Sequence, residues 1–225
     1  MKKETYRLLE NYMLSCCADS SHDKEHIYRV LDNGIRIGRE EGNVDWDVLI
    51  AACLLHDVGR PEQFGDPALC HAQVGSEKAY RFLREQGFSE EFSEKVRHCV
   101  LTHRFRKARP PQTLEAKILF DADKLDATGA LGMARTLMFK SDTGAALYCR
   151  NSDGSIDDGT GDGGDSLFRE YKFKLEKLYD RFFTAAGARL AMERKQIAED
   201  FYQSLLREVS PKSSLADVLE VENVQ

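Results

Sequence analysis

Apolar residues recur every three or four positions along almost the whole chain, which is the spacing of amphipathic α-helices. No alternating strand pattern and no Asn-Gly hairpin turn stands out. The sequence therefore predicts an all-α protein. The first predicted helices cover about 4–17, the stretch from Ser20 or Ser21 to Gly42, 46–56, 70–86 and 89–102. They are followed by a helix near 114–125, a separate one that runs to about Lys140, and two long ones at about 166–186 and 188–208. Asp45, Ser89 and Thr113 stand where N-cap residues belong.

The helices are predicted to form one domain over residues 1–210. Glycine and proline make residues 57–69 a loop, and the Gly- and Asp-rich residues 141–165 are expected to form an exposed flexible loop or a mobile lid. Residues 211–225 are expected to be an acidic tail. A chain of 225 residues can bury a core without help from disulfides or a structural metal.

Composition narrows the class of protein. The chain has 38 Asp and Glu against 32 Lys and Arg, a net charge of −6, so it lacks the basic surface of a duplex-binding protein. It has no apolar run long enough to span a membrane and no apolar stretch of a signal peptide at its start. Its six cysteines form no Cys-x-x-Cys pair and are expected to be reduced, so we expect a cytoplasmic protein.

Four titratable residues interrupt the apolar stripes of separate predicted helices: His26, His56, His103 and Asp121. Each is three, four or seven positions from apolar residues of its stripe, so each is expected to point into the core. For any single histidine the alternative is a hydrogen-bonded core residue, but a buried carboxylate is costly unless it is paired or bound to metal. Together they suit a mixed nitrogen and oxygen site for Mn²⁺, Fe²⁺, Co²⁺, Ni²⁺ or Mg²⁺.

The order of these residues resembles that of a known family. His26 is followed by His56-Asp57 in the string Cys-Leu-Leu-His-Asp-Val-Gly-Arg, and then by Asp121 in Phe-Asp-Ala-Asp-Lys-Leu-Asp. This order is similar to the His…His-Asp…Asp signature of the HD-domain metal-dependent phosphohydrolase superfamily. The likeness covers about residues 20–140 and is greatest to small stand-alone bacterial HD hydrolases, some of which cleave nucleoside triphosphates. It implies a single-domain HD-type helical bundle, completed by the two C-terminal helices.

The resemblance also implies a set of metal ligands. One divalent ion is expected to be held by four residues: His26, His56, Asp57 and Asp121. His71 and His103 stand where some HD proteins have ligands for a second ion, and the alternative is that both bind substrate phosphate. His22 and His98 lie on polar stretches and are expected to be solvated.

For catalysis, Asp57 is the expected general base, since a carboxylate beside a metal-bound water can accept its proton. Glu62 is a nearby carboxylate on the predicted loop and a candidate proton shuttle, but the sequence leaves the general acid open. Lys124, a helical turn after Asp121, is expected to neutralise phosphate charge. Further phosphate-binding candidates are Arg60, Arg104, Arg106, Lys107 and Arg109. The alternative for the run after His103 is a solvated basic segment.

These observations predict a metal-dependent phosphohydrolase whose substrate is a small phosphate-containing anion, most readily a nucleotide such as a nucleoside triphosphate. The expected cofactor is a divalent metal ion (Mn²⁺, Mg²⁺, Fe²⁺, Co²⁺ or Ni²⁺), and neither duplex nucleic acid nor a membrane is an expected partner. One alternative is a di-iron oxygenase of the same fold, which needs His71 and His103 as ligands. Another is a non-catalytic sensor of metal and nucleotide. The oligomeric state stays open.

Overall fold

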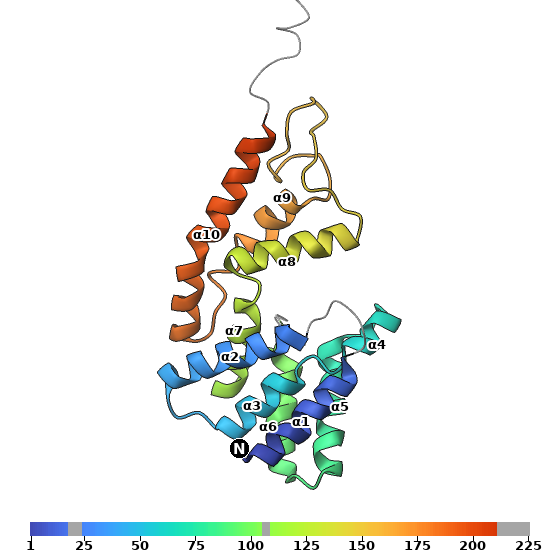
Figure 1. Ribbon diagram of the computed structural model, residues 1–225, viewed down its shortest axis with the longest axis vertical. Coiled ribbons are helices and arrows are strands. Elements are labelled where there is room, and N and C mark those ends of the chain that lie inside the picture. The colour runs from blue at the N-terminus through green and yellow to red at the C-terminus, as the bar shows by residue number, and fades with distance from the viewer. Residues whose placement is uncertain (18–23, 105–108, 211–225) are drawn as a thin grey trace, which may run out of the picture. The chain divides into compact units, whose positions relative to one another are not determined.

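The computed structural model describes residues 1–17, 24–104 and 109–210, and its regular elements in these ranges are helices (Figure 1). The predicted all-α class is therefore confirmed. The chain divides into two compact units: unit 1 comprises residues 1–126 and 179–193, and unit 2 comprises residues 127–178 and those from Arg194 onward. The proposed cap at Ser20 or Ser21 and the predicted tail 211–225 lie outside the described residues.

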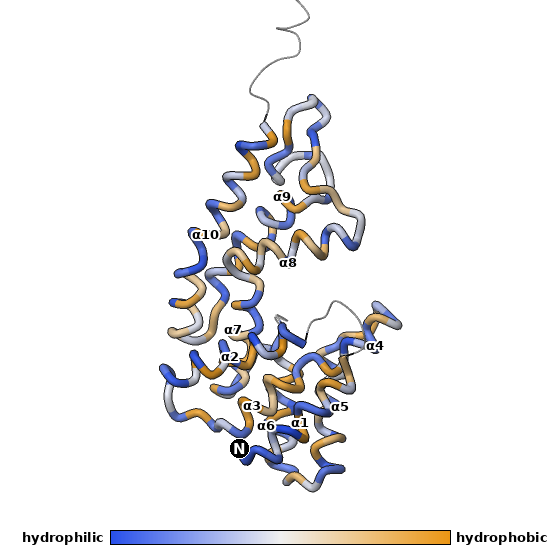
Figure 2. Tube along the Cα trace, in the orientation of Figure 1, coloured by the Kyte–Doolittle hydropathy of each residue, from blue (hydrophilic) through white to orange (hydrophobic). Residues whose placement is uncertain are grey.

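Unit 1 contains seven helices and the start of an eighth in the described residues. They are α1 (Lys3–Cys16), α2 (Lys24–Glu41), α3 (Trp46–Leu55), α4 (Arg60–Gly65), α5 (His71–Glu85), α6 (Glu90–Thr102), α7 (Leu114–Leu125) and the first residues of α10 (Ala185–Val209). The helix α3 packs against α1, α2, α6 and α7. Its residues from Val48 to Leu55 are all apolar (Figure 2), and Ala51 to Leu55 are completely buried. The core of unit 1 is therefore built around α3.

Three helices begin at the N-cap residues that the sequence predicted. The Asp45 carboxylate accepts the N–H of Val48 at 3.2 Å, and Ser89 and Thr113 cap α6 and α7 in the same way. Each cap satisfies an N–H of the first helical turn, which has no partner inside the helix.

Two predicted boundaries are wrong. The loop predicted at 57–69 contains α4, which Pro61 helps to start because its fixed φ suits the first turn of a helix. The helix predicted over 166–186 is interrupted: α9 (Leu167–Glu170) continues into one π-helical turn, η1 (Tyr171–Leu175), and regular helix resumes only at Ala185. The apolar spacing in this region could not show that the backbone before Ala185 binds a side chain of α7, as described below.

Unit 2 contains α8 (Gly129–Asp142), α9, η1 and most of α10. The segment predicted to be a flexible loop folds around Asp157, which is completely buried. Its two carboxylate oxygens accept the N–H groups of Gly159, Gly161 and Gly163 at 2.7–3.0 Å. The predicted role of residues 141–165 as a lid stays a prediction.

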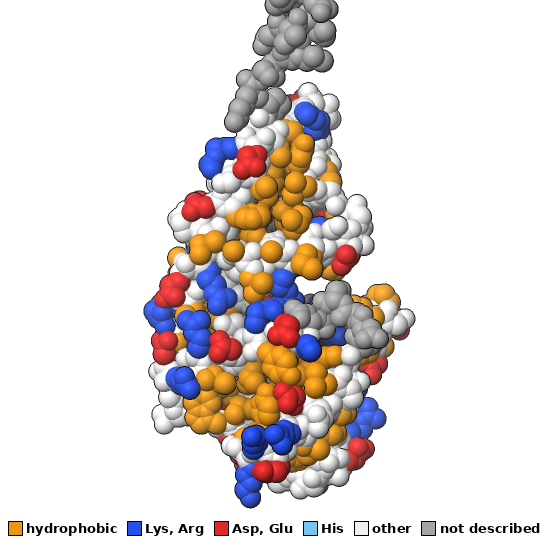
Figure 3. All heavy atoms as spheres, viewed as in Figure 1, with side chains coloured by type: hydrophobic (Ala, Val, Ile, Leu, Met, Phe, Trp, Pro, Cys, Tyr) orange, Lys and Arg blue, Asp and Glu red, His pale blue; other side chains and the backbone are white. Residues whose placement is uncertain are grey.

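The surface is mixed in character. On the face shown in Figure 3, side chains of both charges lie among apolar ones. The most exposed large apolar residues are Met138 and Phe139 of α8 and Phe64 of α4, each more than half exposed. Within the described ranges, no helix is both long enough and apolar enough to cross a membrane.

Candidate metal centre

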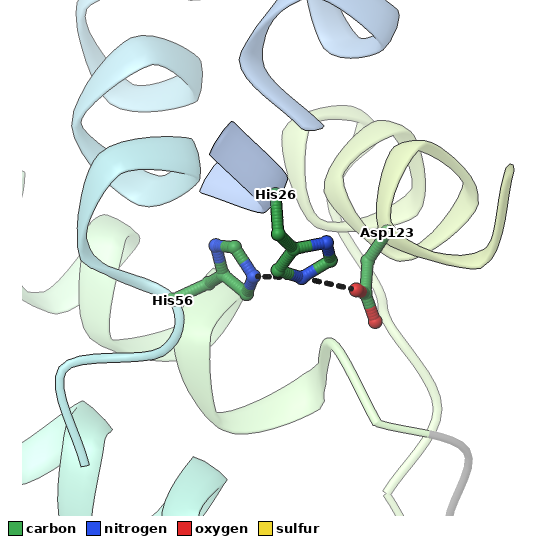
Figure 4. Close-up of side chains that lie close together, drawn as sticks. All are labelled: His26, His56 and Asp123. Carbon is green, nitrogen blue, oxygen red and sulfur yellow. Dashed lines mark hydrogen bonds and ion pairs between the residues drawn. The ribbon is translucent and has the colours of Figure 1, made fainter. Parts of the chain in front are cut away.

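Three side chains from three separate segments of unit 1 lie close together (Figure 4). His26 comes from α2, His56 follows the last residue of α3, and Asp123 comes from α7. Nε2 of His26 lies 3.4 Å from Nε2 of His56 and 3.3 Å from Oδ1 of Asp123. Asp57 lies beside them, with Oδ2 at 3.7 Å from Nε2 of both histidines.

A second group adjoins the first through the same aspartate. Oδ1 of Asp57 lies 3.5 Å from Nε2 of His71 and 3.7 Å from Nε2 of His103. The two imidazole nitrogens are 3.3 Å apart. Asp57 therefore stands between two pairs of histidines and presents one carboxylate oxygen to each pair.

All four histidines turn the same atom toward Asp57. Each Nδ1 is hydrogen-bonded on the far side of the ring to an oxygen: Asp126 Oδ2 for His26, the carbonyl of Cys53 for His56, Gln63 Oε1 for His71 and the carbonyl of Val100 for His103, at 2.6–2.8 Å. Carbonyl and carboxylate oxygens only accept, so a neutral ring carries its proton on Nδ1 and leaves Nε2 with a lone pair. Four lone pairs thus face the centre.

The local fold explains why His56 and His103 take this orientation. Each follows the last residue of its helix, and each Nδ1 donates to the carbonyl three residues earlier. Carbonyl groups of a final helical turn have no partner inside the helix, so the imidazole satisfies one of them while its ring is held in place. The same construction at the ends of α3 and α6 delivers two Nε2 atoms to one site.

His26 is held differently, by a carboxylate. Nδ1 of His26 lies 2.7 Å from Oδ2 of Asp126, which is 1% exposed. Asp126 also accepts two hydrogen bonds from Arg29, at 2.7 Å from Nε and 3.1 Å from Nη2. A carboxylate behind an imidazole fixes the ring and makes its other nitrogen a stronger ligand. Asp126 and Arg29 were not identified from the sequence.

Gly59 allows α5 to reach the centre. A Cβ atom added to Gly59 would lie 2.4 Å from the carbonyl oxygen of His71 and 2.5 Å from the backbone nitrogen of Gly75. Both are backbone atoms, which cannot move aside as the end of a long side chain can. The absence of a side chain at Gly59 is therefore what lets His71 lie next to Asp57.

The site is charged in a way that favours cations. Burial opposes the charge of Asp57, yet the His56 ring and the Arg60 guanidinium hold its pKa well below the usual range. Burial also opposes the charge of Asp123, but its hydrogen bond to His26 keeps its pKa low. Burial, reinforced by the positive charge of Arg60, lowers the pKa of His71 to about 2. Burial followed by the charge of His56 lowers that of His103 to about 4.

These residues fit a divalent metal ion. Donors that share an ion at about 2.1 Å lie roughly 3.0–3.5 Å apart, close to the separations seen here. In each histidine pair two nitrogen lone pairs face each other, an arrangement that a cation between them stabilises. The donor set of histidine nitrogens and carboxylate oxygens suits Mn²⁺, Fe²⁺, Co²⁺ or Ni²⁺. The cluster can hold a divalent metal ion, as expected from the sequence.

The structure does not bring Asp121 to the histidines. Residues two apart on a helix point in nearly opposite directions, so Asp121 and Asp123 occupy different faces of α7. The buried carboxylate of Asp121 accepts the backbone N–H groups of Phe183 and Thr184 and the Thr184 hydroxyl, at 2.6–3.1 Å. Burial raises its pKa to about 6, although the hydrogen bonds from Thr184 act in the other direction. Asp121 is indeed inward, but it holds the start of α10.

Glu62, the candidate proton shuttle, and Lys124, expected to neutralise phosphate charge, both contact residues outside the histidine cluster. Oε1 of Glu62 accepts a hydrogen bond from Nζ of Lys78 at 2.7 Å, and although burial opposes its charge, that bond lowers its pKa. The ammonium of Lys124 lies 4.3 Å from the centre of the Phe120 ring. Neither contact is with the histidine cluster.

Two arginines lie near the second histidine pair. Nε of Arg60 donates to Oδ1 of Asp57 at 3.0 Å, and Nη1 of Arg104 is 4.0 Å from Sγ of Cys70, the residue before His71. Arg109 is exposed. Arg106 and Lys107 lie outside the described residues.

The remaining two histidines are separate from the cluster or not described. Nε2 of His98 accepts the N–H of Gln112 at 3.2 Å, and the ring is partly exposed. His22 lies outside the described residues.

The residues of both groups lie in the part of the chain that matches a known family. The sequence profile of the HD domain matches residues 24–128, a range that contains every member of both clusters. The uncharacterised protein YpgQ of Bacillus subtilis is 30% identical over 197 residues, which cover 84% of this chain and 85% of YpgQ.

Solved structures resemble most of the chain. The crystal structure of B. subtilis YpgQ has a TM-score of 0.71 at 28% identity, covering 92% of this chain and 96% of YpgQ. The structure of YpgQ in complex with ADP has a TM-score of 0.70 at 29% identity, with 91% and 97% covered. A predicted HD superfamily hydrolase from an uncultured Thermotogales bacterium has a TM-score of 0.62 at 27% identity, with 90% and 91% covered.

Proposed function

Since the chain belongs to the HD-domain superfamily and is a metal-dependent hydrolase, we propose that it cleaves a phosphoanhydride bond of a nucleotide, with a nucleoside triphosphate as the expected substrate. The observation that carries this proposal is the position of the Arg60 guanidinium, which touches Asp57 inside a cluster of four histidines. A site that combines metal ligands with an arginine suits phosphate oxygens. The relative YpgQ binds ADP in one of its crystal structures, which supports a nucleotide.

We assign the principal ion to His26, His56, Asp57 and Asp123. A divalent ion there supplies a water of lowered pKa and neutralises charge that develops on the phosphate. Asp123 takes the role that the sequence suggested for Asp121, because it is the carboxylate of α7 that lies beside His26. The side chain of Asp123 is 28% exposed, so this edge of the cluster is open to solvent.

Asp57 has a second role in this proposal. Its carboxylate is ionised at neutral pH, because its pKa is held well below the usual range. It can therefore accept a hydrogen bond from the attacking water and orient it. Arg60 carries five N–H donors, of which contacts within the described chain use one on Asp57 and one on Gln63. In our proposal the other N–H groups of Arg60, and the guanidinium of Arg104, bind phosphate oxygens.

Among the described residues, no carboxyl group at the cluster is placed to act as a general acid, and this favours an anhydride over an ester. Glu62 is ionised and bonded to Lys78, which makes it a poor proton donor. An alkoxide leaving group needs a proton, whereas a phosphate or pyrophosphate leaves as a stable anion and needs positive charge instead. Arg60 and a divalent ion supply such charge.

The test is hydrolysis of a panel of nucleoside triphosphates by the purified chain with Mn²⁺, measured as release of phosphate or pyrophosphate. We expect His56→Ala and Asp57→Ala to abolish turnover. His98→Ala is the matched control, because His98 lies outside the cluster, and it should leave turnover unchanged. Full activity in both cluster variants would contradict the proposal.

The two alternatives give different results in the same experiment. A di-iron oxygenase needs His71 and His103 as ligands and predicts oxygen uptake that depends on Fe²⁺. This alternative is retained because Asp57, His71 and His103 lie close enough together to hold a second ion. A sensor predicts saturable nucleotide binding without turnover for any metal tested.

A further inference from the structure

The two oxygens of Asp57 have different neighbours. Oδ2 faces Nε2 of His26 and His56 at 3.7 Å. Oδ1 faces His71 and His103, but it also accepts a hydrogen bond from Nε of Arg60 at 3.0 Å. The oxygen that an ion at the second pair would use is therefore already bonded to a positive charge.

The groups behind the two histidine pairs differ in charge as well. His26 is backed by the carboxylate of Asp126. His71 is backed by the neutral amide of Gln63, whose Nε2 donates to the carbonyl of Leu69 at 3.0 Å and so directs Oε1 toward the imidazole. The carboxylate of Asp126 thus adds a negative charge behind the pair His26 and His56. Among the described contacts, no carboxylate lies behind the pair His71 and His103.

Arg60 is held in its position at the second pair. Its Nε is bonded to Asp57, and its Nη1 lies 3.4 Å from the same Gln63 oxygen that accepts from His71. Arg104 places another guanidinium on this side, 4.0 Å from the sulfur of Cys70. Like charges in a site of low water content repel strongly, so these arginines oppose a cation between His71 and His103.

We infer that Arg60 restricts the centre to one tightly held divalent ion, because its guanidinium takes the place that a second cation would occupy beside Oδ1 of Asp57. The inference rests on the proposed metal-dependent function. It assigns Arg60 a role in metal stoichiometry that is separate from any contact with phosphate. The donors of the second pair are complete without Arg60, so removal of the guanidinium should open a second ion site.

The test counts ions in the full-length chain. Metal is removed with a chelator, Mn²⁺ is added back at a series of fixed free concentrations, and bound manganese is measured by mass spectrometry and by electron paramagnetic resonance. A pair of ions bridged by Asp57 gives a spin-coupled spectrum that a single ion cannot give. The variants are Arg60→Gln and Arg60→Ala, with Arg97→Gln as the control, since Arg97 is partly exposed and paired with Glu77 and Glu94.

We expect one tightly bound ion in the wild-type chain and in Arg97→Gln. Both Arg60 variants should bind a second ion at least about tenfold more tightly than the wild type and show the coupled spectrum, because the positive charge that repels a second cation beside Oδ1 of Asp57 is gone. Adding His103→Ala to Arg60→Gln should return the count to one.

Each other outcome has a distinct meaning. Two tightly bound ions in the wild-type chain, or a single ion in both folded Arg60 variants, would overturn the inference and leave the proposed hydrolysis standing. No bound manganese in the wild type would instead overturn the proposed function. Circular dichroism of each variant shows that it is folded, and the wild-type count tests the inference even if a variant is not.

Discussion

Oδ1 of Asp123 lies 3.3 Å from Nε2 of His26, so α7 meets α2 at the centre through this aspartate. The other aspartate of the same Asp-Ala-Asp string, Asp121, faces the start of α10 instead. In our proposal Asp123 binds the metal ion, whereas Asp121 anchors the start of α10.

This division predicts opposite phenotypes for two neighbouring substitutions. Asp123→Asn should weaken Mn²⁺ binding by at least about tenfold, because an amide is a poorer ligand than a carboxylate, and should change the stability of the metal-free chain little. Asp121→Ala should lower the free energy of unfolding by about 1–3 kcal/mol, since it leaves N–H groups of Phe183 and Thr184 without an acceptor. Manganese titration and urea unfolding measure the two effects, and the reverse pattern would refute the assignment.

Asp126 provides a second prediction, about the ring that it holds. Asp126→Asn should reduce manganese affinity by about 10–100-fold, because His26 loses the carboxylate that fixes its orientation and makes Nε2 a stronger metal ligand. Asp32→Asn, on the exposed side of the same helix as His26, is the control and should have no effect. Calorimetric titration of both variants checks this, and equal affinities would show that Asp126 does not position His26.

Gly59 provides a third prediction, about the approach of α5. A methyl group at Gly59 would lie 2.4 Å from the carbonyl oxygen of His71, so Gly59→Ala should lower the free energy of unfolding by about 1–3 kcal/mol. It should also displace His71 from Asp57. Gly65→Ala is the control, because a Cβ at Gly65 meets no atom within 4 Å. Thermal unfolding of the two variants compares them, and equal stability would mean that the backbone at Gly59 has room to spare.

The buried histidines predict how the metal-free chain responds to pH. The pKa of His71 is lowered to about 2 and that of His103 to about 4, so below pH 6.5 the unfolded chain binds protons there that the folded chain does not. Stability is therefore lost as the pH falls from about 6.5 toward 4. Asp121 acts in the opposite direction, since its pKa is raised to about 6.

At about 1.4 kcal/mol for each unit of pKa, two histidines outweigh one aspartate, and the net loss between pH 7 and pH 5 is on the order of 2–3 kcal/mol. Urea unfolding of chelator-treated protein at pH 7, 6 and 5 measures it. Stability that is constant or rises toward pH 5 would show that the two rings are protonated in the folded chain.

The helix starts around the site, and several residues of the site, were predicted from the sequence. The helices around the site begin where Asp45, Ser89 and Thr113 cap them, and these signals are local. His26, His56 and Asp57 were assigned by the resemblance, and the structure places them together. The placement of His103 agrees with its inward position in an apolar stripe.

What could not be predicted depends on contacts between distant segments. The apolar stripe of α7 indicated that Asp121 is buried, but not that its partner is the backbone of Phe183 and Thr184. Asp123 of α7 and Asp126, which follows the last residue of that helix, are three positions apart and both contact His26. This spacing is a sequence signal for a shared side of the helix, and the apolar stripe around Asp121 drew attention away from it. The role of Gln63 was hidden for a similar reason, because it lies on a helix that the sequence suggested to be loop.

The most direct test of the metal centre is anomalous X-ray scattering from crystals of the chain grown with Mn²⁺. We predict a strong manganese peak within ligand distance of Nε2 of His26, Nε2 of His56, the Asp57 carboxylate and the Asp123 carboxylate. A peak at Asp121, or no peak among the four histidines at saturating manganese, would contradict the account.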